Sequence, residues 1–189
     1  MDKPIVNRVS NSPLITINLE KIRFEGTRCF FDLKNILDKG VILRENKIRD
    51  YVKNHDWTQY SSQFVAVGCS SEAILPSWSK LLIAASLKSY ARKIVIGDLE
   101  QLETVLFESA INQLDFTKYN NKSIIIKGCS DPSIPDSAYG FLINKLQGVA
   151  KKISYGEACS SVPLKIAKRP IEPFHCQRDL RYYTQYYLQ

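Results

Sequence analysis

The chain has 189 residues, of which 44% are hydrophobic and 24% are charged, enough apolar material for a real core. The formal net charge is +7, but the basic residues are scattered among acidic ones, which argues against nucleic-acid binding. We find neither an apolar run long enough to span a bilayer nor the basic start and apolar stretch of a signal peptide. We therefore expect a cytoplasmic protein without membrane contact, whose thiols are kept reduced.

The N-terminal part of the sequence indicates an arm rich in strands, followed by a helix. Residues 14–20, LITINLE, alternate apolar and polar side chains as a strand with one buried face does. Residues 28–37, RCFFDLKNIL, begin as a second strand. Residues 40–43 indicate a short third strand, and an amphipathic helix is expected over residues 45–54.

From residue 63 onward, short apolar strands alternate with longer helices. Strands are expected at 63–68, 93–98, 122–128 and 151–156, with a further one at 162–168. Helices are expected at 76–91, 99–114 and 136–149. Pro76 suits a first helical turn, Asp136 suits an N-cap, and the acids early in the second helix suit its dipole. This alternation predicts an α/β fold with a mostly parallel sheet flanked by helices.

The composition divides the chain into two parts. Residues 1–167 are expected to form a single α/β domain. Residues 168–189 contain two early prolines and then four tyrosines, which indicates a C-terminal extension. Because disordered segments are usually poor in aromatic residues, we expect this extension to pack on its own chain or on a second copy in a homo-oligomer.

A Cys-Ser pair recurs at the same point of the predicted fold. Residues 65–79 and 124–139 each run from an apolar strand through Gly-Cys-Ser and a loop to Pro and a helix. A shorter version, YGEACSSVP, follows at residues 155–163. Because the carboxyl ends of parallel strands lie along one edge of a sheet, Cys69, Cys129 and Cys159, together with Asp98, are predicted at that edge, where such folds bind ligands.

Three thiols at one edge would suit a zinc or iron–sulfur site, because thiolates are strong ligands for both. The fourth ligand could be His55, Asp98, Asp131 or a water molecule. The different-class alternative is an interaction or scaffold protein whose cysteines are packing residues, as free cysteines often are. A weaker alternative is an enzyme with a cysteine nucleophile and His55 as its base.

The serines and the remaining cysteines have separate interpretations. Three serines could bind an anion together with backbone N–H groups at helix starts, although N-capping is the better explanation for each of them: Ser70, Ser130 and Ser160. Cys29 lies within a predicted strand and is expected in the core, and Cys176 in the extension has no assigned role.

Several motifs together resemble a known family. They are VNRVSNSPLITINLE, NHDWTQY, GCSSEAILPSW, GDLEQLETVLF, KGCSD and YGEACSSVP. In combination they are similar to bacterial proteins catalogued as a domain of unknown function, number 2480, over residues 5–167. That family brings no established activity. Its association with iron–sulfur assembly genes implies an accessory role in metal or sulfur handling, with a protein partner.

Overall fold

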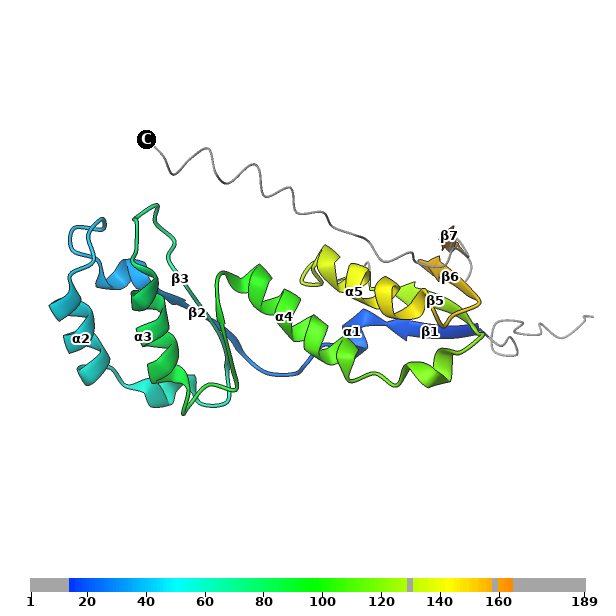
Figure 1. Ribbon diagram of the computed structural model, residues 1–189, viewed down its shortest axis with the longest axis horizontal. Helices are drawn as coiled ribbons and strands as arrows, with labels where there is room; N and C mark the ends of the chain where they lie inside the picture. The colour runs from blue at the N-terminus through cyan, green and yellow to red at the C-terminus, as the bar shows by residue number, and fades with distance from the viewer. Residues whose placement is uncertain (1–13, 129–130, 158–159, 165–189) are drawn as a thin grey trace, which may run out of the picture.

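The computed structural model describes residues 14–128, 131–157 and 160–164. The described chain is elongated: one β-sheet lies toward each end, and helix α4 (Leu99–Asn112) lies between them (Figure 1). Among the described strands, every pairing except the last is parallel. The expected α/β class, with mostly parallel pairing and flanking helices, is therefore confirmed. The strands form two sheets, however, rather than the single sheet assumed for the cysteine edge.

The three-stranded sheet has the order β2-β3-β4, with β2 at Arg28–Asp32, β3 at Phe64–Gly68 and β4 at Lys93–Ile96. Helices α2 (Glu45–Asn54) and α3 (Ser77–Leu87) pack on one face, and α4 packs on the other. Every residue of β3 is buried. The strand is apolar throughout because a central parallel strand is covered on both sides.

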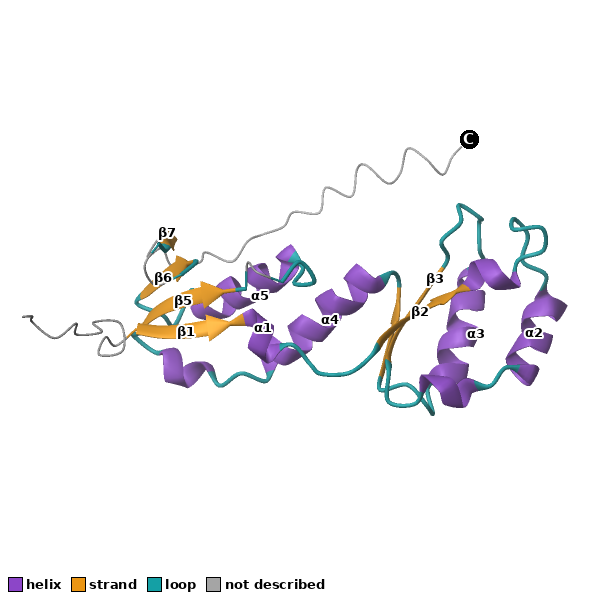
Figure 2. Ribbon diagram, turned by 180° about the vertical axis from the view of Figure 1, so that it is seen from behind, coloured by secondary structure: helices purple, strands orange, loops and turns teal. Residues whose placement is uncertain are grey.

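The four-stranded sheet has the order β1-β5-β6-β7. Its strands are β1 (Leu14–Asn18), β5 (Ser123–Lys127), β6 (Lys152–Tyr155) and the antiparallel β7 (Val162–Leu164). Helix α5 (Asp136–Leu146) packs on this sheet, and Figure 2 shows β1 and β5 in front of α5. Strand β1 pairs with β5 along its whole length, so the expected N-terminal arm is an integral strand of the sheet.

Helix α4 belongs to the cores of both sheets. Leu102 and Leu106 pack against the three-stranded sheet, in one cluster with Phe64 and other buried residues. Phe107 and Ile111 belong to the core of the four-stranded sheet. Each pair is spaced by four residues, so the two pairs form adjacent stripes along the helix. One helix therefore joins the two cores.

The two ends of the molecule repeat the same elements at a constant spacing. The 3₁₀ helix η2 (Trp57–Tyr60) is followed by β3, α3 and β4. The 3₁₀ helix η3 (Phe116–Tyr119) is followed by β5, α5 and β6, and each of these four elements is shifted by 59 positions from its counterpart. The residue pairings of β3 with β4 and of β5 with β6 correspond in the same way.

The turns between these elements repeat as well. Before β3, Ser62 has φ 62° and donates its N–H to the carbonyl of Tyr90. Before β5, Asn121 has φ 54° and donates its N–H to the carbonyl of Val149. Left-handed backbone conformations are uncommon outside glycine, so two of them 59 positions apart, with matching hydrogen bonds, mark a duplicated module.

The first strands complete the duplication with a different spacing. Strand β1 and helix α1 (Leu19–Ile22) recur 14 positions later as β2 and the 3₁₀ helix η1 (Leu33–Ile36). One copy therefore lies within the other along the chain. We call residues 28–98 the inserted module, and residues 14–23 with 99–157 the divided module.

Two local predictions are corrected. Residues 40–43 form no strand, and Asp38 and Ile42 make an isolated bridge there. Asp136 is the first residue of α5 rather than its N-cap, a position that Pro135 occupies without a side-chain hydrogen bond. Proline has no N–H and a fixed φ, so it accommodates the helix start without side-chain capping.

Two other expectations concern the ends of the chain and the membrane. The extension expected at residues 168–189 lies outside the described residues, and the single-domain boundary at residue 167 stays a prediction. In the described part of the chain, no helix combines the length and apolar character needed to cross a bilayer.

Candidate functional site

The first Cys-Ser turn follows β3. Cys69 is half-buried against the core of the inserted module, and its Sγ lies 3.1 Å from Oγ of Ser71. Ser70 donates its N–H and its hydroxyl to the carboxylate of Asp32, at 3.0 and 2.6 Å. Burial acts to raise the pKa of Asp32, but hydrogen bonds from Ser70 and Lys34 outweigh it and lower the pKa below its ordinary value. The donors expected to bind an external anion thus hold a carboxylate of the chain itself.

Cys69 does not share a sheet edge with the other two cysteines of the predicted site. Strand β3, which precedes Cys69, lies in the three-stranded sheet, whereas β5 and β6 are neighbours in the four-stranded sheet. Those two strands precede Cys129 and Cys159, which lie outside the described residues together with Ser130. Within the described ranges, no group of three or more His, Cys, Asp or Glu side chains could hold a metal ion. The ligand set stays a prediction.

His55 lies in an aromatic cluster at the end of α2. Its ring centroid is 4.6 Å from that of Tyr51 and 4.7 Å from that of Trp57. Its Nε2 is 3.2 Å from the hydroxyl of Tyr60. Burial lowers the pKa of His55 below its ordinary value, against the opposing effect of Asp56. This environment favours a neutral imidazole that packs among aromatic rings.

The other candidate residues stabilise local structure. Asp98 accepts the N–H of Gln101 at 2.8 Å in a capping box that begins α4. Asp131 accepts the N–H and the hydroxyl of Ser133 at 2.8 and 2.6 Å, which folds the loop between β5 and α5. Ser160 is exposed in the loop before β7. The carboxylates of Asp98 and Asp131 thus accept hydrogen bonds from their own loops.

A pocket of about 610 Å³ is built by three segments, one of which follows β5 and Cys129 in the sequence. These segments are the start of α4, the loop from β5 into α5, and the stretch that leads from the divided module into the inserted one. Its volume is within the range typical of small-molecule sites. The lining residues are Arg23, Arg28, Leu99, Glu100, Glu103, Pro132, Ser133, Ile134, Pro135 and Asp136.

Three charged side chains of this lining form a network. Arg23 donates to both carboxylate oxygens of Glu103, from Nη2 at 2.6 Å and from Nε at 3.3 Å. Arg28 donates from Nε to Oε1 of Glu103 at 2.8 Å. The hydrogen bond to Glu103 raises the pKa of Arg23 against the effect of burial. Arginine side chains are always charged in proteins, so both guanidiniums count as positive. Two positive charges share one carboxylate, and the Arg23–Glu103–Arg28 network carries a surplus of one positive charge.

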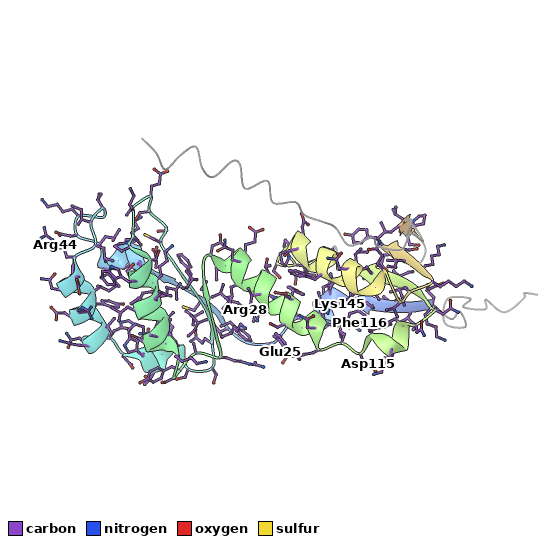
Figure 3. The ribbon with its side chains drawn as sticks, viewed as in Figure 1. Glu25, Arg28, Arg44, Asp115, Phe116 and Lys145 are labelled. Carbon is purple, nitrogen blue, oxygen red and sulfur yellow. The ribbon has the colours of Figure 1, made fainter. Side chains whose placement is uncertain are left out.

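Arg28 is the incompletely satisfied member of the network. Its side chain is 14% exposed, and Figure 3 shows it between the three-stranded sheet and α4. Its Nη1 donates to the carbonyl of Gly26, and its guanidinium lies 5.0 Å from the ring centroid of Phe64. Its Nη2 is buried and has no hydrogen-bond partner among the described residues. An unpaired buried donor on a charged group is costly, so this atom favours an added acceptor.

The sequence contained a signal for this network. It was missed because the acidic residues early in α4 were all explained by the helix dipole. Glu103 lies among the buried positions 102, 106 and 107 of α4, so a carboxylate interrupts the apolar face of the helix. A charge on such a face requires a buried partner. Its partners Arg23 and Arg28 are 75 or more positions away, and nothing in the local sequence identifies them.

The structure thus defines a duplicated α/β protein with a charged pocket at the junction of its two modules. The chain belongs to the family described as protein of unknown function (DUF2480), whose profile matches residues 3–167. No curated protein and no solved structure shows significant similarity to it.

Proposed function

We propose that this protein binds a small molecule in the junction pocket and that Arg28, supported by Arg23, holds an anionic group of that molecule. The single observation that carries the proposal is Arg28, which lines the pocket and whose buried Nη2 has no hydrogen-bond partner in the part of the chain that the structure describes. A carboxylate or phosphate oxygen would satisfy this donor once the guanidinium turns toward the pocket, because Nη2 is closed to solvent in this structure, and it would balance the surplus charge of the network. A guanidinium group suits a carboxylate or phosphate because two of its coplanar N–H groups can donate to two oxygens at once.

The duplication provides an internal comparison that supports a binding role. The divided module contributes Arg23, Glu100, Glu103 and Asp136 to the pocket. At the positions that correspond to Arg23 and Asp136, 14 and 59 residues away, the inserted module has Leu37 and Ser77. Corresponding elements therefore form without these two charges. They are better explained by what the pocket holds than by what the module needs to fold.

A purely structural role for the network is the competing explanation. The network links the segment that enters the inserted module to α4, the helix that follows that module. Its role could be only to hold these two segments together. Arg28→Lys distinguishes the two roles, because lysine keeps the positive charge beside Glu103 but loses the paired, coplanar N–H donors of the guanidinium. The matched control is Arg92→Lys: Arg92 also lies 5.0 Å from the Phe64 ring centroid and does not line the pocket.

The experiment is an NMR titration of the isotope-labelled full chain with hexanoate and, separately, with inorganic phosphate. We expect hexanoate or phosphate to shift the amide signals of the pocket residues. Arg28→Lys should weaken that binding about tenfold, the loss of one charged hydrogen bond, while Arg92→Lys leaves it unchanged. Equal weakening by both variants, or no shift of pocket signals with either probe, would contradict the proposal.

A thiolate site for zinc or an iron–sulfur group is a second candidate, now centred on two cysteines. Strands β5 and β6 are parallel neighbours, and Lys127 at the end of β5 forms an ion pair at 2.5 Å with Glu157, which lies just beyond β6. Cys129 and Cys159 follow those residues in the chain. Elemental and acid-labile sulfide analysis of anaerobically purified protein tests this role. Metal that is lost in Cys129→Ser or Cys159→Ser but kept in Cys69→Ser would support it, and metal-free protein would rule it out.

A further inference from the structure

The rim of the junction pocket carries charges of the opposite sign to its floor. Glu100 and Asp136 line the pocket and are both exposed, and neither makes a hydrogen bond or ion pair within the described structure. The floor holds Arg23 and Arg28 around Glu103. A ligand whose anionic end reaches the floor therefore passes two carboxylates that are free to take a cation.

The sum of the lining charges distinguishes between classes of ligand. Two arginines and three carboxylates line the pocket, so the formal side-chain charge is −1. The helices α4 and α5 both begin at the rim and add partial positive charge from their N-termini. The lining is thus close to neutral overall, yet its two signs are separated. Such a site disfavours a polyanion, whose second charge would meet the rim carboxylates, and suits a molecule that carries both signs.

Glu100 and Asp136 each have an ordinary explanation as acids in a first helical turn, where the dipole favours them. That explanation accounts for their presence on two helices but not for their convergence on one pocket. The inserted module shows that an acid is not required at the start of α5, because α3 begins with Ser77 where α5 begins with Asp136.

We propose that the ligand of the junction pocket is zwitterionic, with a carboxylate or a similar anion bound by Arg28 and a protonated amine held between Glu100 and Asp136. The class is that of amino-carboxylates in which a spacer separates the two charges. This inference rests on the proposed binding function, since it assigns the second end of the same ligand.

Three probes of matched chain length test the inference on the full-length protein: hexanoate, adipate and 6-aminohexanoate. They share a carboxylate and differ at the other end, which is neutral, negative or positive. Dissociation constants come from NMR titration or calorimetry. We expect 6-aminohexanoate to bind at least fivefold more tightly than adipate, with hexanoate between them. The preference should disappear in Glu100→Gln and in the Glu100→Gln, Asp136→Asn double variant, and persist in Glu108→Gln, a control on the exposed face of α4 outside the pocket.

The outcomes separate this inference from the function on which it rests. If adipate binds as tightly as 6-aminohexanoate and binding still depends on Arg28, the pocket takes anions and the zwitterion assignment is wrong. A preference for 6-aminohexanoate that survives in Glu100→Gln and in the double variant also overturns the assignment. If none of the three probes shifts signals of the pocket residues, the binding function itself fails and the inference fails with it. The single Glu100→Gln variant keeps the test valid if the double variant folds poorly.

Discussion

Asp56 and Asp115, 59 positions apart, perform the same task in the two modules. The carboxylate of Asp56 accepts the N–H and the hydroxyl of Thr58 at 3.0 and 2.6 Å. That of Asp115 accepts the same groups of Thr117 at 3.1 and 2.5 Å. Each carboxylate begins a 3₁₀ helix that leads into the central strand of its module. The duplication therefore extends to individual hydrogen bonds.

The first prediction is that Asp56→Ala and Asp115→Ala lower the melting temperature at neutral pH by similar amounts, a few degrees each. The hydrogen bonds from Thr58 and Thr117 lower the pKa of both carboxyls below their ordinary 3.8. Their stabilising effect is thus complete above that value and is lost as the pH falls through the lowered pKa of the folded state. Melting curves from pH 7 down to pH 2 should show both variants converging on the wild type in acid. A deficit that persists at the lowest pH would contradict this account.

The second prediction concerns the helix shared by the two cores. Leu102 of α4 is fully buried, and Leu102→Ala should lower the free energy of unfolding by about 3 kcal/mol. Because α4 joins both cores, we expect the described modules to unfold in one transition in the wild type. Urea denaturation measures the number of transitions. Tryptophan fluorescence reports the inserted module through Trp57 and Trp78, and circular dichroism reports both modules.

The control for Leu102→Ala is Leu99→Ala, at an exposed position one turn earlier in the same helix. It should change stability by no more than about 0.5 kcal/mol. Fluorescence and circular dichroism transitions with separate midpoints in the wild type would show that the modules unfold independently, and the prediction of a single domain would then be wrong.

Local patterns in the sequence are sufficient to predict most elements of this fold. The helix at 45–54 and the strands that contain residues 64–68, 93–96, 123–127 and 152–155 follow from periodicity and apolar runs. The partition of strands between two sheets does not, because β3 and β5 are both short, mostly buried apolar runs that follow the same kind of turn. Which strand pairs with which depends on contacts between distant segments that local patterns do not encode.

The duplication was accessible from the sequence through a signal stronger than the Cys-Ser turns. The pentapeptides DWTQY at residues 56–60 and DFTKY at 115–119 keep the capping aspartate, the threonine and a packing tyrosine. Gly97 and Gly156 also correspond, with φ of 152° and 110°. The pocket was less accessible, because its floor combines Arg23 and Arg28 with a glutamate far along the chain, and no periodicity relates them.

The third prediction is that Glu103→Gln destabilises the protein by roughly 2 kcal/mol, since it leaves two guanidiniums side by side without a counter-charge. The loss should be smaller than the ~3–5 kcal/mol of a fully buried pair, because Arg23 remains 30% exposed. Glu45→Gln is the matched control: Glu45 pairs with Arg49 at 2.8 Å on an exposed helix surface, and its loss should cost under about 0.5 kcal/mol. Urea denaturation at low and moderate salt compares the two. Equal effects of the two variants would mean that the network contributes no more than a surface ion pair.

The fourth prediction concerns the pH dependence that His55 confers. Burial in the aromatic cluster lowers the pKa of His55 in the folded state below the ordinary 6.5, so the unfolded chain takes up a proton more readily. Stability should therefore fall as the pH drops from about 7 through 6.5 toward the lowered pKa of the folded state. In His55→Gln this dependence should be reduced between pH 7 and pH 5, where the carboxyl groups remain ionised. Melting temperatures across that range measure it, and His175→Gln separates the contribution of the other histidine in the chain. An unchanged slope in His55→Gln would show that the imidazole is protonated as easily in the folded protein as in the unfolded chain.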